Sequence, residues 1–220
     1  MAWTNPVTYI AGAILTAAQM NVMQANAFAG GPIYTTETLR DAGITSPFEG
    51  QRAYITAPEV AKTTATGATT AIPGGIQTIY NGSNWACLTA VGALSNTSGT
   101  TTTALPTYVT TLTGDGTAVS VTIVTGTTAA IQLSGTMAHS GGLSTQMVLS
   151  ISVSGATTIA AGTNNGCSIN STGVGYNQTL ARSFILSGLT AGTNVFTLNY
   201  GAQAGTQTWS SRNLTVQGIA

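Results

Sequence analysis

From residue 107 onward the sequence repeats one pattern, in which a short run rich in Val, Ile, Leu and Thr is followed by a turn rich in Gly, Ser or Asn. Apolar and polar residues alternate within these runs, as at Val119, Val121 and Ile123. The runs are TYVTTLT, AVSVTIVT, TAAIQLSGTMA, TQMVLSISVSG, TTIAAG, RSFILSGL, NVFTLNYGA and SRNLTVQGI. About eight alternating strands at such spacing indicate an antiparallel β-sandwich over residues 107–220, of jelly-roll or immunoglobulin-like topology.

A smaller β-module is expected before the sandwich, over residues 44–91. QRAYIT alternates as a strand, and IQTIYNGSNWACLTAV is typical of strand, turn and strand, because Asn-Gly between apolar runs is a strong hairpin signal. Tyr54, Tyr80 and Trp85 are the aromatic residues expected in its core. The polar stretch GALSNTSGTTTTALP is expected to be an extended linker over residues 92–106.

Residues 1–43 are expected to form an N-terminal arm and helix. The arm should be extended near Pro6, which has no backbone donor, and the helix should begin at Thr16 and end at the Gly-Gly-Pro after Ala29. A helix of about three turns is marginal alone in water, so it should dock on its own domain or on a neighbouring subunit. Helical periodicity is absent after Gly30, and the chain is predicted to be mainly β.

The same N-terminal segment is a poor match to a targeting signal. It has no Lys or Arg before Arg40, and polar residues interrupt its apolar run. A secretory signal needs a basic start and a continuous apolar region, and a spanning helix needs roughly 18 apolar residues. We therefore expect neither a signal peptide nor a membrane partner.

Charge is scarce and uneven. Only 5% of the residues are Asp, Glu, Lys or Arg, against about 25% in average globular proteins. After Thr63 the charged residues are Asp115, Arg182 and Arg212. Cytosolic monomers normally rely on charge to stay apart, so this surface fits a protein packed in a regular assembly or located outside the cell. Nucleic acid is excluded as a partner, because neutralising phosphates needs clustered Lys and Arg.

The residues that carry chemistry are few. His139 is the sole histidine, in an expected turn, and Asp115 is a turn-former by its Gly-Asp-Gly context. Cys87 and Cys167 are far apart, so free thiols are favoured over a disulfide, and with one His they give no metal-ligand spacing. We expect no enzyme activity, cofactor or metal site.

The acidic residues of the first third raise one further possibility, a pair of glycosidase acids. They alternate along the chain with basic residues, which favours surface ion pairs. The acids are Glu37, Asp41, Glu49 and Glu59, and the bases are Arg40, Arg52 and Lys62.

Two stretches carry a family likeness. MAWTNPVTYIAGAILTAAQMNVMQANAF resembles the N-terminus of many tailed-bacteriophage virion proteins, where a W-T-x-P-x-T pattern and a T-A-A-Q-(L/M)-N pattern precede a short helix. The chain departs from it in having QAN at residues 24–26 in place of a charged continuation. PFEGQRAYITAP and IQTIYNGSNWACLT resemble the small β-module of phage fibre and decoration proteins. The matching residues there are Glu49, Gly50, Arg52, Ala53, Tyr54, Tyr80, Asn81, Gly82, Ser83 and Trp85.

This resemblance covers about the first ninety residues and implies a structural virion protein. The leading hypothesis is a capsid decoration (cement) or head-fibre protein on the capsid exterior, assembled in the bacterial cytoplasm. Its partners would be the major capsid protein and other copies of itself, a trimer by family habit. The expected anchoring and oligomerisation residues are Trp3, Pro6, Tyr9, Leu15, Met20, Met23 and Phe28.

Two alternatives remain at this stage. The first is a tail fibre or minor tail protein that contacts the host surface, with Tyr176, Tyr200 or Trp209 exposed on sandwich loops to bind sugar. Packing in the core is the favoured interpretation for these three aromatic residues. The second is a secreted carbohydrate-binding or adhesin module, which requires the missing signal peptide.

Overall fold

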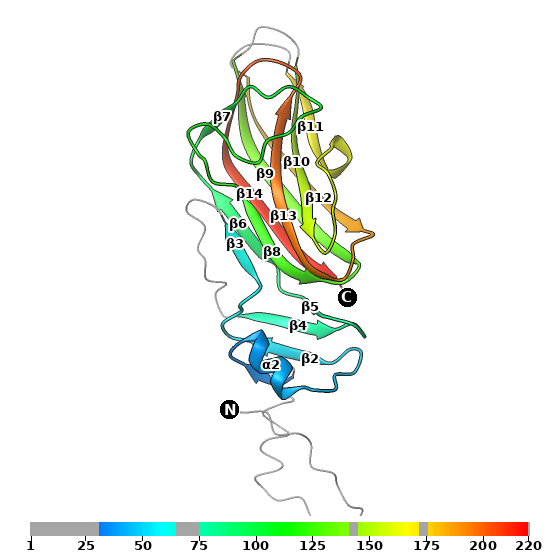
Figure 1. Cartoon of the computed structure of the whole chain (residues 1–220). Coiled ribbons are helices and arrows are strands. Elements are labelled where there is room, and N and C mark those ends of the chain that lie inside the picture. The colour runs from blue at the N-terminus through cyan, green and yellow to red at the C-terminus, as the bar shows by residue number, and fades with distance from the viewer. Residues whose placement is uncertain (1–30, 65–74, 141–144, 172–175, 220) are drawn as a thin grey trace, which may run out of the picture.

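The computed structural model describes residues 31–64, 75–140, 145–171 and 176–219. Within these ranges the chain is mainly β, as predicted, and two five-stranded sheets form the sandwich while a smaller sheet lies at one end of it (Figure 1). The expected N-terminal arm and helix, with all seven anchoring residues from Trp3 to Phe28, lie outside the described residues.

The first sheet of the sandwich, called here the β10 sheet, has only antiparallel neighbours. Its strands, in spatial order, are β11 (Gly166–Ser171), β10 (Thr145–Gly155), β13 (Gly192–Ala202), β8 (Ser120–Thr125) and β3 (Lys62–Thr64). The predicted alternation is confirmed in β8, where Val121 and Ile123 are fully buried. TYVTTLT and TTIAAG, expected as strands, make isolated bridges instead, at Val109, Leu112 and Thr113 in the first and at Ile159 in the second.

The second sheet, called here the β9 sheet, is also antiparallel. Its strands, in spatial order, are β12 (Tyr176–Ser187), β9 (Thr128–His139), β14 (Gln207–Ile219) and β6 (Val91–Ser95). Strand β7 (Gly99–Thr101) pairs with the first residues of β14, on the same side of β14 as β6. Both β6 and β7 fall largely in the stretch expected to be a linker. That stretch is part of the sheet because β14 supplies it with hydrogen-bonding partners, and Ala93 and Ser95 point inward.

The end sheet has the order β1 (Ile33–Tyr34), β2 (Arg52–Ile55), β4 (Ile76–Tyr80) and β5 (Trp85–Cys87). The hairpin predicted at Asn81-Gly82 is confirmed, with Gly82 at a φ of 90° and the Asn81 side chain accepting the amide hydrogen of Asn84 at 2.8 Å. The module is not one continuous stretch of chain. Between β2 and β4 the chain leaves it for the sandwich, where β3 pairs with β8.

A helix that the sequence analysis missed connects β1 to β2. Helix α2 (Glu37–Gly43) begins after Thr36, whose hydroxyl accepts the Leu39 amide hydrogen at 3.3 Å and satisfies one free donor of the first turn. Seven residues are too few to produce a visible apolar stripe, which is why periodicity gave no signal. No helix in the described residues is long and apolar enough to cross a membrane.

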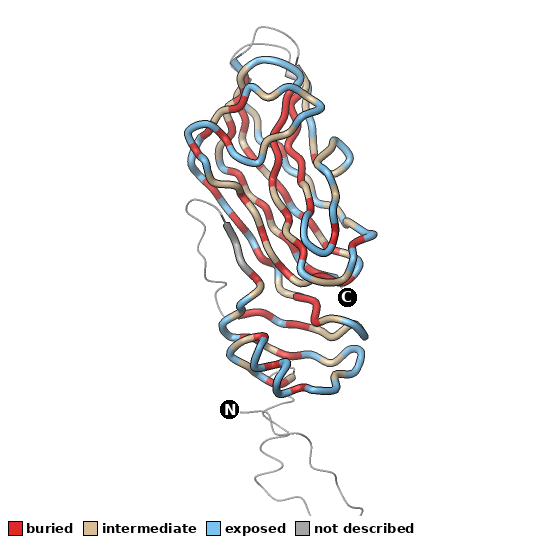
Figure 2. The backbone as a smooth tube through the Cα atoms, in the orientation of Figure 1, coloured by how far each residue is buried: buried red, intermediate tan, exposed pale blue. Residues whose placement is uncertain are grey.

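One hydrophobic core runs through the sandwich and continues into the end sheet (Figure 2). Ile55, Ile76 and Cys87 of the end sheet belong to the same buried cluster as the inward residues of the two large sheets. A small second cluster holds Trp85, and Tyr80 packs against it with its ring centroid 5.5 Å from that of Trp85. Tyr54 does not join these residues. It is half-buried, because alternation along β2 puts it on the face opposite Ala53 and Ile55.

Candidate functional site

The most distinctive polar feature of the sandwich begins with an irregularity in β14. Between Ser210 and Asn213 this strand has one more residue than its partner β9, which is the definition of a β-bulge. Ser211 takes a φ of 46°, unusual for any residue but glycine. The extra residue changes which side chains point inward, and Arg212 therefore enters the core.

Arg212 is fully buried and makes several polar contacts there. Its guanidinium forms an ion pair with Asp115, and it donates to Ser95 Oγ at 2.8 Å, to the Thr97 carbonyl at 3.1 Å and to the Tyr200 hydroxyl at 3.2 Å. A buried charge is tolerated only when it is paired and hydrogen-bonded in this way. The network joins both sheets of the sandwich, since Tyr200 lies on β13 and Arg212 on β14.

Asp115 is the acidic partner and is only 4% exposed. Burial by itself raises the pKa of this carboxyl group. Hydrogen bonds from Ser95 Oγ at 2.7 Å and the Thr117 amide, together with the positive charge of Arg212, outweigh burial and hold the pKa below its usual value. Asp115 lies in the predicted turn, where Leu112 and Asp115 bridge. Its ionic role was missed.

Two of the aromatic residues considered for sugar contacts lie in this core and not on loops. Tyr200 and Trp209 are fully buried, with ring centroids 5.5 Å apart. Burial raises the pKa of Tyr200 to about 12. Both therefore pack in the core, as the favoured interpretation had it. Tyr176 begins β12, but its side chain lies outside the described residues.

His139 and the cysteines also have structural surroundings. His139 is buried at the end of β9 and not in a turn, and its Nε2 lies 3.3 Å from the carbonyl oxygen of Ala204. Both cysteines are free thiols, Cys87 buried and Cys167 half-buried. Burial raises the pKa of Cys87 to about 11. In the described ranges no group of three His, Cys, Asp or Glu is placed to hold a metal ion.

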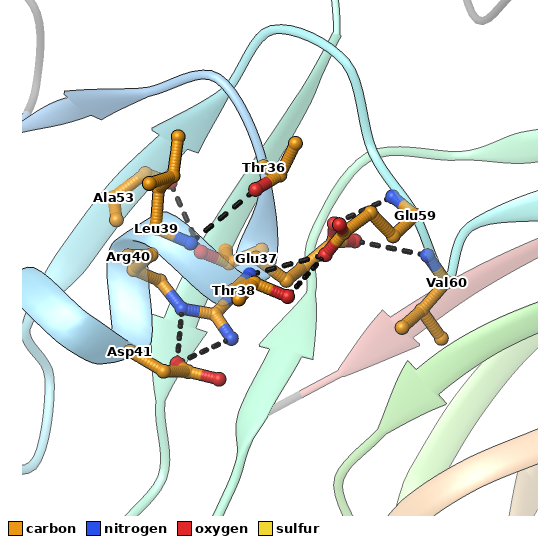
Figure 3. A network of polar contacts seen from close by, with 10 residues as sticks. Thr36, Glu37, Thr38, Leu39, Arg40, Asp41, Ala53, Glu59 and Val60 are labelled. Carbon is orange, nitrogen blue, oxygen red and sulfur yellow. Dashed lines mark hydrogen bonds and ion pairs between the residues drawn. The ribbon is translucent and has the colours of Figure 1, made fainter.

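In the end module, acidic residues form hydrogen bonds between α2 and the segment that leads into β3 (Figure 3). The Glu37 carboxylate accepts the amide hydrogens of Glu59 at 2.6 Å and Val60 at 3.3 Å. In return, Thr38 donates to the Glu59 carboxylate from its amide at 3.1 Å and from its hydroxyl at 2.8 Å. Glu37 was expected in a surface ion pair. It is instead buried, which is possible because backbone amides of the neighbouring segment donate hydrogen bonds to its carboxylate.

Arg40 packs the same helix onto the end sheet. Its guanidinium carbon lies 4.8 Å from the centroid of the Trp85 ring, a cation–π arrangement, and its Nη2 lies 2.8 Å from the Asp41 carboxylate. Arg40 is buried while Asp41 is exposed. This is the expected ion pair between neighbouring charges, with the added contact to Trp85.

The end of the molecule that carries α2 also exposes large apolar side chains. Ile33 of β1 is 44% exposed, Leu39 of α2 is 53% exposed and Phe48 is 66% exposed. Near the junction with the sandwich there is also an open cleft of about 320 Å³, lined by Glu49, Gly50, Ile79, Tyr80, Asn81 and Thr127. The exposed apolar residues are the better candidates for a contact with another protein, because removing apolar surface from water favours association.

Comparison with known proteins gives only remote likenesses. No protein-family model matches the sequence, and no curated protein matches it. Among solved structures, a chain of infectious bursal disease virus, Gt strain, is similar over 72% of this chain and 50% of its own, at 10% identity and a TM-score of 0.43. The enzymatically active domain of bacteriophage CBA120 tailspike protein 4 is similar over 60% of this chain and 19% of its own, at 12% identity and a TM-score of 0.28.

The TNF protein Eiger from S. frugiperda is similar over 60% of this chain and 93% of its own, at 12% identity and a TM-score of 0.39. The chain spans about half the length of the bursal disease virus chain named above. A viral chain and a phage tailspike domain are both among the similar structures, but at these scores the likeness carries no argument about activity or partners.

Proposed function

We propose that this protein is a structural component of a tailed-bacteriophage virion, and specifically a capsid decoration or head-fibre protein that binds the lattice of the major capsid protein. The proposal rests on the N-terminal resemblance and on one structural observation. Of the three charged residues after Thr63, Asp115 and Arg212 are buried against each other, and Arg182 donates to the carbonyls of Asn164 and Gly166. Apart from Lys62 of the edge strand β3 and the half-buried Arg182, the described sandwich therefore presents hydroxyl, amide and apolar groups.

Such a surface suits a protein held at high density in an ordered shell. The exposed charged residues of the described chain lie mostly in the α2 module, so long-range attraction can act there, whereas on the sandwich the contact area itself must provide the affinity. A protein that binds the assembled shell and not its separate parts stabilises the shell by mass action. We assign the docking end to the α2 module, where Ile33, Leu39 and Phe48 are exposed beside the point at which the described chain begins.

In this proposal the partners are the major capsid protein and other copies of the chain, with the trimer implied by the family resemblance. The protein performs no catalysis and binds no cofactor, nucleic acid or membrane. A tail fibre or minor tail protein is the competing role. The burial of Tyr200 and Trp209 removes two of the three aromatic residues that would have favoured it.

The test is the copy number per purified virion, measured by quantitative mass spectrometry against the major capsid protein. A decoration protein should be present in hundreds of copies and should remain in tailless heads at the same ratio. A handful of copies that separate with the tails would contradict the capsid role and support the tail role.

A further inference from the structure

The outer faces of the two large sheets are covered to very different extents. On the outer face of the β10 sheet, Val148 and Ser150 are fully buried. Ser150 Oγ donates to the carbonyl of Gly162 at 2.7 Å and accepts the amide hydrogen of that residue at 3.1 Å, so a loop lies against this face. At Gly201 a side chain would meet Leu105 at 2.8 Å, because a second loop packs there.

The outer face of the β9 sheet is different, because every described residue on it is half-buried or exposed. Strand pairing and alternation define this face. From β9 it takes the even-numbered residues from Thr128 to Ala138, and from β12 the odd-numbered residues from Asn177 to Ser187. From β14 it takes Thr208 and Ser210 and, after the bulge, the odd-numbered residues from Asn213 to Ile219. From β6 it takes Gly92 and Leu94.

The composition of this face is unusual in two respects. It contains no Asp, Glu, Lys, Arg or His, and most of its side chains are the small ones of Ala, Ser and Thr. It also holds every large hydrophobic side chain that is exposed in the described part of the sandwich, namely Leu94 at 38%, Ile185 at 59% and Ile219 at 36%. Ile185 lies opposite Ala130 and Ile219 opposite Thr128, so the two isoleucines are on the strands that flank β9, two residues apart in register.

We propose that this face packs against the same face of a second copy of the chain, forming a two-fold pair. In a two-fold contact each residue off the axis meets a different residue of the same face on its partner. Because the described face carries no charge, the contact buries no charge without a partner, and small side chains let two sheets approach to the roughly 10 Å at which sheets pack.

The size of the face fits this partner. Strands β9 and β12 are 12 residues long. At about 3.4 Å per residue and 4.8 Å per strand, these strands with β14 and the five residues of β6 give a face of roughly 600–700 Å². A stable interface buries roughly 800 Å² on each partner. The pair requires no contact with a virion, so its test and the copy-number test can fail separately. Combined with the trimer of the proposed function, the pair would give a hexamer, which is also an even number of protomers.

Sedimentation of the purified full chain tests the pair. Wild-type protein should sediment as an even number of protomers, and Ser183→Glu, in the middle of β12 on this face, should halve that mass. The matched control is Ser154→Glu, which places the same charge on an exposed strand position of the β10 sheet and should leave the mass unchanged. Circular dichroism shows whether both variants retain the sandwich.

A second variant keeps the test decisive. Ser183→Lys should also halve the mass, because either charge would be buried in the contact without a partner. A monomeric or odd-numbered wild type, or a mass that neither substitution changes, would overturn the proposal. If the mass is unchanged but Ser183→Glu abolishes binding to heads, the face contacts capsid protein and the pair is likewise refuted.

Discussion

Asp115 and Arg212 form an ion pair inside the sandwich although 97 residues separate them along the chain. The pair also satisfies Ser95, which donates to Asp115 and accepts from Arg212. The loss of either charge leaves the other buried without its partner.

Arg212→Met should therefore lower the free energy of unfolding by about 3–5 kcal/mol, because it strands the Asp115 carboxylate in the core. Asp115→Asn should cost a similar amount by stranding the guanidinium. The double variant should lose clearly less than the sum of the two, which urea denaturation of all four proteins would reveal. Strictly additive losses would show that the two side chains do not interact energetically.

Stability should also depend on pH through Asp115. Its pKa in the folded protein lies below the value of about 3.9 found in unfolded chains, so the unfolded state takes up protons first as the pH falls. The stabilisation is fully present above that value and disappears as the pH falls through the lower folded-state pKa. Between pH 6 and pH 2, the stability advantage of wild type over Asp115→Asn should shrink. Parallel stability curves would refute this assignment.

The bulge at Ser211 makes its own prediction. Ser211→Gly should stay within about 1 kcal/mol of wild type, because relief of strain at a φ of 46° opposes the extra entropy of glycine in the unfolded chain. Ser211→Val should destabilise by about 1–3 kcal/mol, because a β-branched residue is strained in this conformation. Thermal unfolding compares the two variants. Equal melting temperatures would contradict the observed backbone.

Deletion of Ser211 is a sharper test of the same feature. It would restore simple alternation, in which Arg212 and the buried Leu214 still face inward and Arg212 lies opposite Gly135 of β9. The deletion variant should therefore keep a cooperative unfolding transition in urea. Loss of that transition would show that the fold depends on the extra residue itself.

The contacts of Glu37 should hold α2 in place. Glu37→Ala removes an acceptor from two backbone amides and should cost about 1.5–3 kcal/mol. Amide hydrogen exchange should accelerate at Glu59 and Val60. Glu49→Ala is the matched control, since Glu49 is exposed, and it should change stability by less than about 0.5 kcal/mol. Equal effects of the two substitutions would refute the role given to Glu37.

The parts of the fold that were predictable are those in which the residues themselves carry the periodic signal. Val121 and Ile123 alternate with polar residues because one face of β8 is buried, and Asn81-Gly82 specifies a turn locally. Helix α2 and strand β7 carry no such signal. The helix is only seven residues long, and β7 is a strand only because β14 pairs with it.

The buried ion pair was out of reach for a different reason. Which way Arg212 points depends on the extra residue at Ser211. Serine rarely adopts a positive φ, so its presence in the sequence does not predict a bulge. The scarcity of charge did contain a hint. Asp115, Arg182 and Arg212 are the charged residues of an otherwise uncharged segment, and a buried charge is costly without a partner. The sequence therefore favours pairing but does not say which arginine pairs with Asp115.

The position of β14 in its sheet has a consequence for biosynthesis. This strand lies between β9 on one side and β6 and β7 on the other, so a sheet begun at Val91 is completed only by residues after Gln207. On the ribosome, those earlier strands emerge long before their central partner, and folding that depends on such distant contacts is slow. A nascent or truncated chain therefore lacks the finished outer face of the β9 sheet.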